Sequence, residues 1–133
     1  MAEISVTGID HVVLRVRNLE RAIGFYTQVL GCQVERRQDE LGLVQLRAGT
    51  SLIDLMSTDG KLGRAGGKEP GSDGHNMDHL CLRVANFDVE RISAYLREKG
   101  VAVGEIGSRY GAGGEAISIY LKDSEGNGLE LRG

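Results

Sequence analysis

The sequence contains no tryptophan, a single proline and two cysteines, and only 5% of its residues are aromatic. Because Cys32 and Cys81 are the only thiols, no disulfide framework is indicated, and we expect a reducing, cytoplasmic location. No apolar run approaches the roughly 20 residues of a membrane span, and residues 1–10 lack the apolar stretch of a signal peptide. The net charge of −3, without a basic run, argues against nucleic acid and membrane surfaces as partners.

The composition that remains is that of a globular protein with a core. Of 133 residues, 41% are apolar and 26% are charged. Twenty glycines are spread between periodic segments rather than gathered in a low-complexity tract, so they predict many tight turns.

A repeated strand is the most informative feature of the sequence. "DHVVLRV" at residues 10–16 recurs as "DHLCLRV" at residues 78–84. In each copy every second residue is apolar: Val12, Leu14 and Val16 in the first, and Leu80, Leu82 and Val84 in the second. Strand alternation therefore places the histidine on the opposite face. A segment with helical spacing follows each copy and is closed by a glycine, Gly31 in the first and Gly100 in the second.

Both halves of the chain predict the element order β-α-β-β-β, and therefore an α+β fold. The strands are expected at residues 9–17, 32–37, 42–48 and 51–56, and again at residues 77–84, 101–106, 117–122 and 129–132. We predict one domain, residues 1–133, made of a first module (8–56), a Gly-rich linker (57–76) and a second module (77–133).

Four polar residues stand at equivalent places in the two modules. His11 and His79 lie near the start of the first strand, and Asp54 and Glu130 lie between apolar neighbours in the last strand. If the modules pack side by side, these side chains face a shared concavity. Two imidazoles and two carboxylates are a ligand set for one divalent ion, and Ni, Zn, Co, Mn and Fe all remain open.

The segments "HVVLRV", "RAIGFYTQVLG", "DHLCLRV" and "ISIYLKDSEGNGLELRG" resemble the vicinal oxygen chelate superfamily, nearest to its glyoxalase I-like proteins. This superfamily also includes extradiol dioxygenases, methylmalonyl-CoA epimerase, and fosfomycin and bleomycin resistance proteins. The resemblance spans residues 8–132 and implies two βαβββ modules in a U-shaped, partly open mixed-sheet barrel, often completed by a homodimer. The family's ligands come from the first and last strand of each module, which matches His11, Asp54, His79 and Glu130.

The resemblance implies a metal-dependent lyase or isomerase of the glyoxalase I type, acting on a small molecule with two vicinal oxygens. The metal holds an enediolate while a base, expected to be Glu130 with Asp54 as ligand or second base, moves a proton. Glutathione is a candidate co-substrate, as a hemithioacetal, because Arg15 matches an arginine that binds its carboxylate in glyoxalase I. The further expected substrate contacts are Ser118 and Tyr120 on a strand, and Arg109 and Tyr110 in a flexible loop over residues 107–115.

Two alternatives remain open. Glyoxalase I-like sequences usually carry Glu where this chain has Asp54; without Asp54 the set becomes two histidines and one carboxylate, as in Fe(II) extradiol dioxygenases and fosfomycin-resistance transferases. A non-catalytic drug-binding protein of the same fold is the other alternative. Two more residues lie on the strand that starts the second module. We expect the Cys81 side chain to be buried and to serve in packing, and Arg83 to have a structural role.

Overall fold

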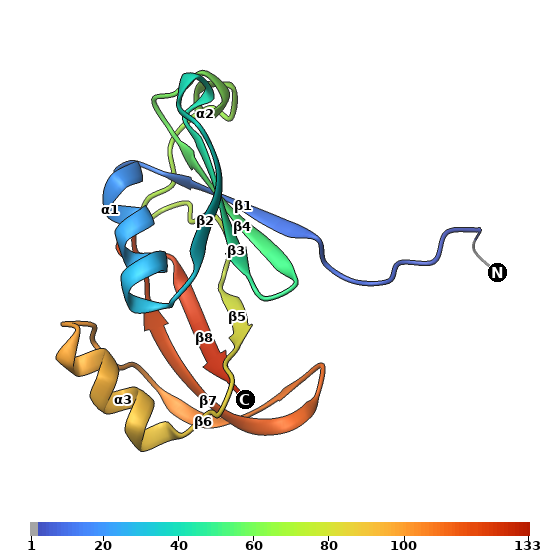
Figure 1. The fold of residues 1–133 in the computed structure, drawn as a ribbon, viewed down its shortest axis with the longest axis vertical. Helices are drawn as coiled ribbons and strands as arrows, with labels where there is room; N and C mark the ends of the chain where they lie inside the picture. Colours follow the sequence, from blue (N-terminus) through green and yellow to red (C-terminus); the bar gives the residue numbers. More distant parts are fainter. Residues whose placement is uncertain (1–2) are drawn as a thin grey trace. The chain divides into compact units, whose positions relative to one another are not determined.

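The structure is a computed structural model and describes residues 3–133 (Figure 1). The chain divides into two compact units, residues 1–69 and 70–133, and the boundary falls inside the predicted linker. Each unit contains one four-stranded mixed sheet. Among the helices of the described residues, none combines the length and the apolar character needed to cross a bilayer.

The first unit is built around the strand order β1-β4-β3-β2, in which β1 is parallel to β4 and the other pairs are antiparallel. Its strands are β1 (His11–Val16), β2 (Gln33–Gln38), β3 (Leu43–Ala48) and β4 (Ser51–Ser57). Its helices are α1 (Leu19–Gly24), which continues as a π-helical turn (Phe25–Val29), a 3₁₀ turn (Asp39–Leu41) and α2 (Lys61–Ala65).

The second unit repeats this arrangement in the order β5-β8-β7-β6, with β5 parallel to β8. Its elements are β5 (Leu80–Arg83), α3 (Val89–Glu98), β6 (Ile106–Gly111), β7 (Gly114–Lys122) and β8 (Gly128–Arg132). The predicted α+β class with two βαβββ modules is confirmed. Each of the two sheets is open rather than closed into a barrel.

The main helix of each unit is capped by a side chain at its start, and it is closed by the glycine that the sequence predicts. The side chains of Asn18 and Asp88 accept a hydrogen bond from the amide three residues further on, at 3.0 and 2.8 Å. After each helix the backbone turns through the left-handed region at a glycine, with φ of 76° at Gly31 and 77° at Gly100.

Strand alternation separates the core of each unit from its polar face. The buried side chains include Leu14, Val16, Tyr26, Val44, Leu46, Ile53 and Leu55 in the first unit, and Ile92, Leu96, Ile119, Leu121, Leu129 and Leu131 in the second. Because successive strand residues point to opposite faces, the histidines and carboxylates predicted as ligands point away from these side chains.

The prediction for residues 101–115 was wrong. Residues 101–105 form no strand, and the expected flexible loop over 107–115 is instead a β-hairpin made by β6 and β7. Its turn ends at Gly114, where φ is 94°. The predicted linker also carries structure, because it contains α2 and an isolated bridge between Gly71 and Gly74.

Candidate active site

Strand pairing gives the two predicted histidine–carboxylate pairs the same place in their sheets. In the first unit Val13 pairs with Asp54, and in the second Cys81 pairs with Glu130. Each histidine stands two residues before the residue that pairs with the carboxylate. The internal repeat therefore extends to the register of the strands that carry the polar residues.

In the second unit the pair is in direct contact. His79 Nε2 lies 3.0 Å from Glu130 Oε1, and the buried Ser118 hydroxyl donates a hydrogen bond to Glu130 Oε2 at 2.6 Å. Burial alone would raise the pKa of Glu130, but hydrogen bonds from Ser118 and Tyr120 outweigh it and hold the pKa below its usual value. Glu130 is therefore an ionised carboxylate at neutral pH, although only 5% of it is exposed.

The other ring nitrogen of His79 is held by the preceding residue. His79 Nδ1 lies 2.6 Å from Asp78 Oδ2, so an Nδ1–H proton is donated to that carboxylate. This hydrogen bond, assisted by the charge of Glu130 and opposed by burial, raises the pKa of His79. The ring lies between two carboxylates, and a divalent cation can take the place of a proton on Nε2.

His11 repeats this arrangement in the first unit. Its Nδ1 lies 2.7 Å from Asp10 Oδ1, and this hydrogen bond, with the charge of Asp54, raises the pKa of His11. Gln45 donates a hydrogen bond to Asp54 Oδ2 at 3.2 Å. The other carboxylate oxygen, Asp54 Oδ1, is buried and has no hydrogen-bond partner among residues 3–133. A buried carboxylate oxygen without a donor is costly, and a bound cation would satisfy it.

These pairs fit a divalent ion as partial ligand sets. His79 Nε2 and Glu130 Oε1 lie 3.0 Å apart, close enough that one ion could be held by both side chains. Histidine ligands usually donate their second N–H to a carboxylate, as both histidines do here. Within the described part of the chain, however, no group of three or more His, Cys, Asp or Glu side chains lies close enough to hold an ion.

Three of the predicted substrate residues lie together beside the second pair. The Tyr120 ring packs edge-on against the His79 ring, with 5.7 Å between centroids, and the Arg109 guanidinium lies 5.4 Å from the Tyr120 centroid. Arg109 is also paired with Glu105 at 2.6 Å. Ser118 is fully buried against Glu130, so it positions the carboxylate rather than offering a free hydroxyl.

Arg15 lies in the first unit and donates hydrogen bonds to main-chain carbonyl groups. Its guanidinium donates to the oxygens of Gly63, Gly67 and Lys68 at 3.1, 2.7 and 3.0 Å. These bonds hold the segment that includes the end of α2. A contact between Arg15 and a glutathione carboxylate stays a prediction.

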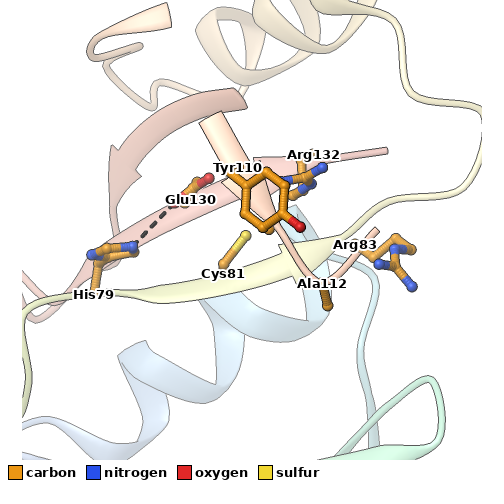
Figure 2. Close-up of a pocket in the computed structure, with 8 residues that line it drawn as sticks. His79, Cys81, Arg83, Tyr110, Ala112, Glu130 and Arg132 are labelled. Carbon is orange, nitrogen blue, oxygen red and sulfur yellow. Dashed lines mark ion pairs between the residues drawn. The ribbon is translucent and has the colours of Figure 1, made fainter. Parts of the chain in front are cut away.

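A pocket of about 360 Å³ opens next to the second pair (Figure 2). In Figure 2, Cys81 lies between two groups of side chains: His79 and Glu130 are on one side of it, and Arg83 is on the other. Tyr110, predicted to contact substrate, lines this pocket and is 83% exposed. Cys81 is exposed and lines the pocket, so the expectation that it is buried packing was wrong; partial burial still raises the pKa of its thiol.

Sequence reasoning missed several residues around the site. Asp10 and Asp78 were part of the repeated dipeptide "DH", and that repetition was the available signal for their role beside the histidines. Gln45 pairs with Asp54 as Tyr120 pairs with Glu130, but no sequence signal links two such different side chains. Arg132 also lines the pocket and was not singled out.

Comparison with known proteins gives one family. The model described as "Glyoxalase/Bleomycin resistance protein/Dioxygenase superfamily" matches residues 8–131. The virulence protein STM3117 of Salmonella typhimurium is 29% identical over 97% of this chain and 85% of its own length. In the comparison of structures it superimposes with a TM-score of 0.77 at 25% identity, covering 97% of this chain and 98% of its own.

Two further relatives cover most of this chain. The glyoxalase domain-containing protein RDO1 of Mycosarcoma maydis is 31% identical over 97% of this chain and 69% of its own length. The mitochondrial methylmalonyl-CoA epimerase of Bos taurus is 26% identical over 91% of this chain and 70% of its own length. The relatives thus include an isomerase and proteins whose names give no reaction.

Proposed function

Because the chain belongs to the glyoxalase/bleomycin resistance protein/dioxygenase superfamily, we propose that it is a metal-dependent lyase or isomerase of the glyoxalase I type. Its substrate would be a small molecule with two vicinal oxygens, and the reaction would move a proton between adjacent carbons. The observation that carries this proposal is the repeated pair of histidine and buried carboxylate, in which an aspartate backs each imidazole.

The proposed ligands of one divalent ion are His11, Asp54, His79 and Glu130. Such an ion supplies Lewis-acid polarisation of two neighbouring substrate oxygens, which lowers the pKa of a proton on the adjacent carbon. The donor atoms suit Ni, Zn, Co, Mn or Fe. The chain would work as a cytoplasmic homodimer, and the two pairs that share an ion would come from one chain or from two.

Glu130 is the proposed base. Its carboxylate is ionised, only 5% exposed and fixed in orientation by the hydrogen bond from Ser118. A base of this kind reaches a substrate proton without competition from bulk water. Tyr120 and Arg109 lie beside the His79–Glu130 pair, where a phenol and a guanidinium support negative charge that develops on oxygen.

The first test is the metal content of the purified protein, measured by elemental analysis. We expect about one divalent ion per site in the wild type, its loss in a His79→Ala variant and its retention in a His75→Ala control. A protein that takes up no metal even after reloading would contradict the proposal and leave the drug-binding alternative. Iron together with dioxygen consumption would instead favour the extradiol-type alternative.

The second test follows the proton. The wild type, supplied with a glutathione hemithioacetal or another α-hydroxycarbonyl compound in deuterated water, should exchange the carbon-bound proton. A Glu130→Gln variant should lose this exchange by roughly a thousandfold or more while it keeps the far-ultraviolet circular dichroism of the wild type. Wild-type exchange in the variant would remove Glu130 from the proposed role.

A further inference from the structure

The pocket of the second unit extends beyond the histidine–carboxylate pair to two arginines. Strand alternation places His79, Cys81 and Arg83 along one face of the chain at β5, and Glu130 and Arg132 along the same face of β8. Cys81 pairs with Glu130, and Arg83 pairs with Arg132. The pocket therefore has one end made by an imidazole and a carboxylate and another end made by two guanidinium groups (Figure 2).

Arg132 is a buried cation whose hydrogen bonds are incomplete. It is 4% exposed, and its two terminal nitrogens donate to the main-chain oxygens of Arg109 and Gly114 at 3.3 and 2.7 Å. Its Nε is buried and has no hydrogen-bond partner among the described residues. Neutral carbonyl groups do not balance its charge, and burying a cation without an anion is unfavourable.

Arg83 supplies a second positive charge at the same end. It is exposed, lines the pocket, and makes no hydrogen bond or ion pair within the part of the chain that the structure describes. Two guanidinium groups on paired strand positions repel each other unless an anion lies between them.

Two glycines of the β6–β7 hairpin leave space for these guanidinium groups. A Cβ added at Gly111 would lie 2.3 Å from Arg132 Nη1, and one added at Gly113 would lie 3.2 Å from Arg83 Nη2. The hairpin turn thus packs its bare backbone on both arginines. Any larger residue at position 111 would displace the Arg132 guanidinium.

We propose that the arginine end of this pocket binds an oxyanion of the substrate, a carboxylate or a phosphate group, through Arg83 and Arg132. This inference rests on the proposed function and specifies its substrate class: a compact anionic molecule rather than a neutral one. Glu130 and Arg132 are two residues apart on β8, which corresponds to roughly 6.6 Å along a strand. A small acid spans that distance, with its vicinal oxygens at the His79–Glu130 pair and its anion on the guanidinium groups. Guanidinium groups bind both kinds of oxyanion with paired hydrogen bonds.

The proposal is tested by measuring anion binding to the full chain in its metal-free form. A chelator first removes the metal, and dialysis then removes the chelator. Malonate and inorganic phosphate are titrated separately at low ionic strength by calorimetry. We expect Arg83→Gln to weaken the binding of the preferred anion roughly tenfold, because it removes hydrogen bonds to a charged group. Arg97→Gln removes the same charge from the exposed face of α3 and should leave affinity within about twofold.

A second variant moves a guanidinium without changing charge. Gly111→Ala should weaken anion binding by displacing Arg132, whereas Gly74→Ala, where an added Cβ meets nothing within 4 Å, should not. Stronger binding of malonate would identify the anion as a carboxylate, and stronger binding of phosphate would identify it as a phosphoryl group.

Equal affinity in the wild type, Arg83→Gln and Gly111→Ala would overturn the proposal. So would no binding of either anion at about 20 mM, which is about twenty times a Kd of about 1 mM. Since the protein is metal-free, this failure is separate from a failure to bind metal. Intact metal uptake with no anion binding would reject the arginine site alone, and the reverse result would reject the metal centre alone.

Discussion

At the scale of single residues, the aspartate before each histidine determines which ring nitrogen is available to a metal. Asp78 accepts the Nδ1–H of His79, and Asp10 does the same for His11. Such hydrogen bonds fix the ring tautomer and make the other ring nitrogen a stronger ligand for a metal ion. We predict that Asp78→Asn lowers the affinity for Zn²⁺ roughly tenfold or more, as measured by competition with a chromophoric chelator.

The matched control for this prediction is Asp73→Asn. It removes one carboxylate from an exposed position five residues away from Asp78 and should leave the affinity for Zn²⁺ unchanged. Equal losses in the two variants would mean that the general charge of the segment, rather than the hydrogen bond to His79, governs metal binding.

The same hydrogen bond predicts how protons compete with the metal. Because the pKa of His79 is raised, mainly by Asp78, the imidazole keeps its proton to a higher pH than a free histidine does. Any stability that this proton adds to the metal-free fold is present at low pH and is lost as pH rises through the raised pKa. Metal binding has the opposite dependence and strengthens as pH rises through it.

Proton NMR of the His79 ring in metal-free protein measures this pKa directly. The value in Asp78→Asn should lie below the wild-type value. A variant pKa equal to or above that of the wild type would show that Asp78 does not hold the Nδ1 proton.

The residues of the site were predictable to different degrees. His79 and Glu130 followed from strand alternation and the repeat, because both stand opposite a run of apolar neighbours. Arg132 was not singled out, although the same alternation places it on the same face as Glu130. Its partners could not be predicted, because they are main-chain oxygens of a hairpin that the sequence did not predict.

At the scale of elements, the two helix-terminating glycines are a matched pair. Gly31 and Gly100 have φ of 76° and 77°, and an added Cβ meets nothing within 4 Å at either position. Alanine at each position should therefore lower the free energy of unfolding by about 1 kcal/mol through backbone strain alone, as measured by urea denaturation. Similar losses at the two positions are expected because the helices end in the same way.

Gly24 provides the opposite control. It has helical dihedrals, with φ of −58°, and an added Cβ there also meets nothing within 4 Å. Gly24→Ala should raise the free energy of unfolding by about 0.5–1 kcal/mol, because alanine has less freedom to lose than glycine. If Gly24→Ala instead lowered the free energy of unfolding, the helix itself would be intolerant of alanine. The losses at positions 31 and 100 could then not be assigned to the left-handed turn.

The hairpin of residues 106–122 shows why part of the fold was not predicted. Residues of β6 alternate between exposed and half-buried, and none is fully buried, so the strand lacks the apolar alternation of a core strand. Glycine and polar residues in such a strand resemble a loop in the sequence. The hairpin forms because β6 pairs along its length with β7, a contact between segments that local patterns do not reveal.

At the scale of the whole molecule, the repeat keeps its strand pairing while its connections differ in length. The first strands are offset by 68 residues, from His11 to His79, and the last by 76, from Asp54 to Glu130. The eight additional residues lie between these strands, yet each histidine keeps its place relative to its carboxylate. The sequence could therefore predict both pairs and the modules that carry them, but not how many of the four side chains bind one ion.

The number of protein ligands is the final prediction, and Asp54 decides it. Asp54 Oδ1 is buried without a hydrogen-bond partner among residues 3–133, which is unfavourable unless a cation occupies the position. We therefore predict four ligands. His11→Ala, His79→Ala and Glu130→Gln should each reduce affinity for Zn²⁺ by at least about tenfold, and Asp54→Asn should do so as well.

The thermal shift on adding metal measures the same loss. An ion at about 100 times its Kd stabilises the wild type by about 2.7 kcal/mol, and a tenfold weaker site loses about 1.3 kcal/mol of this. If Asp54→Asn keeps the full shift while the other three variants lose it, the site has two histidines and one carboxylate. The iron-dependent oxygenase alternative would then be the better reading of the same fold. A shift lost in all four variants would show that one ion depends on both modules, and would thereby account for a repeated strand with a histidine near its start.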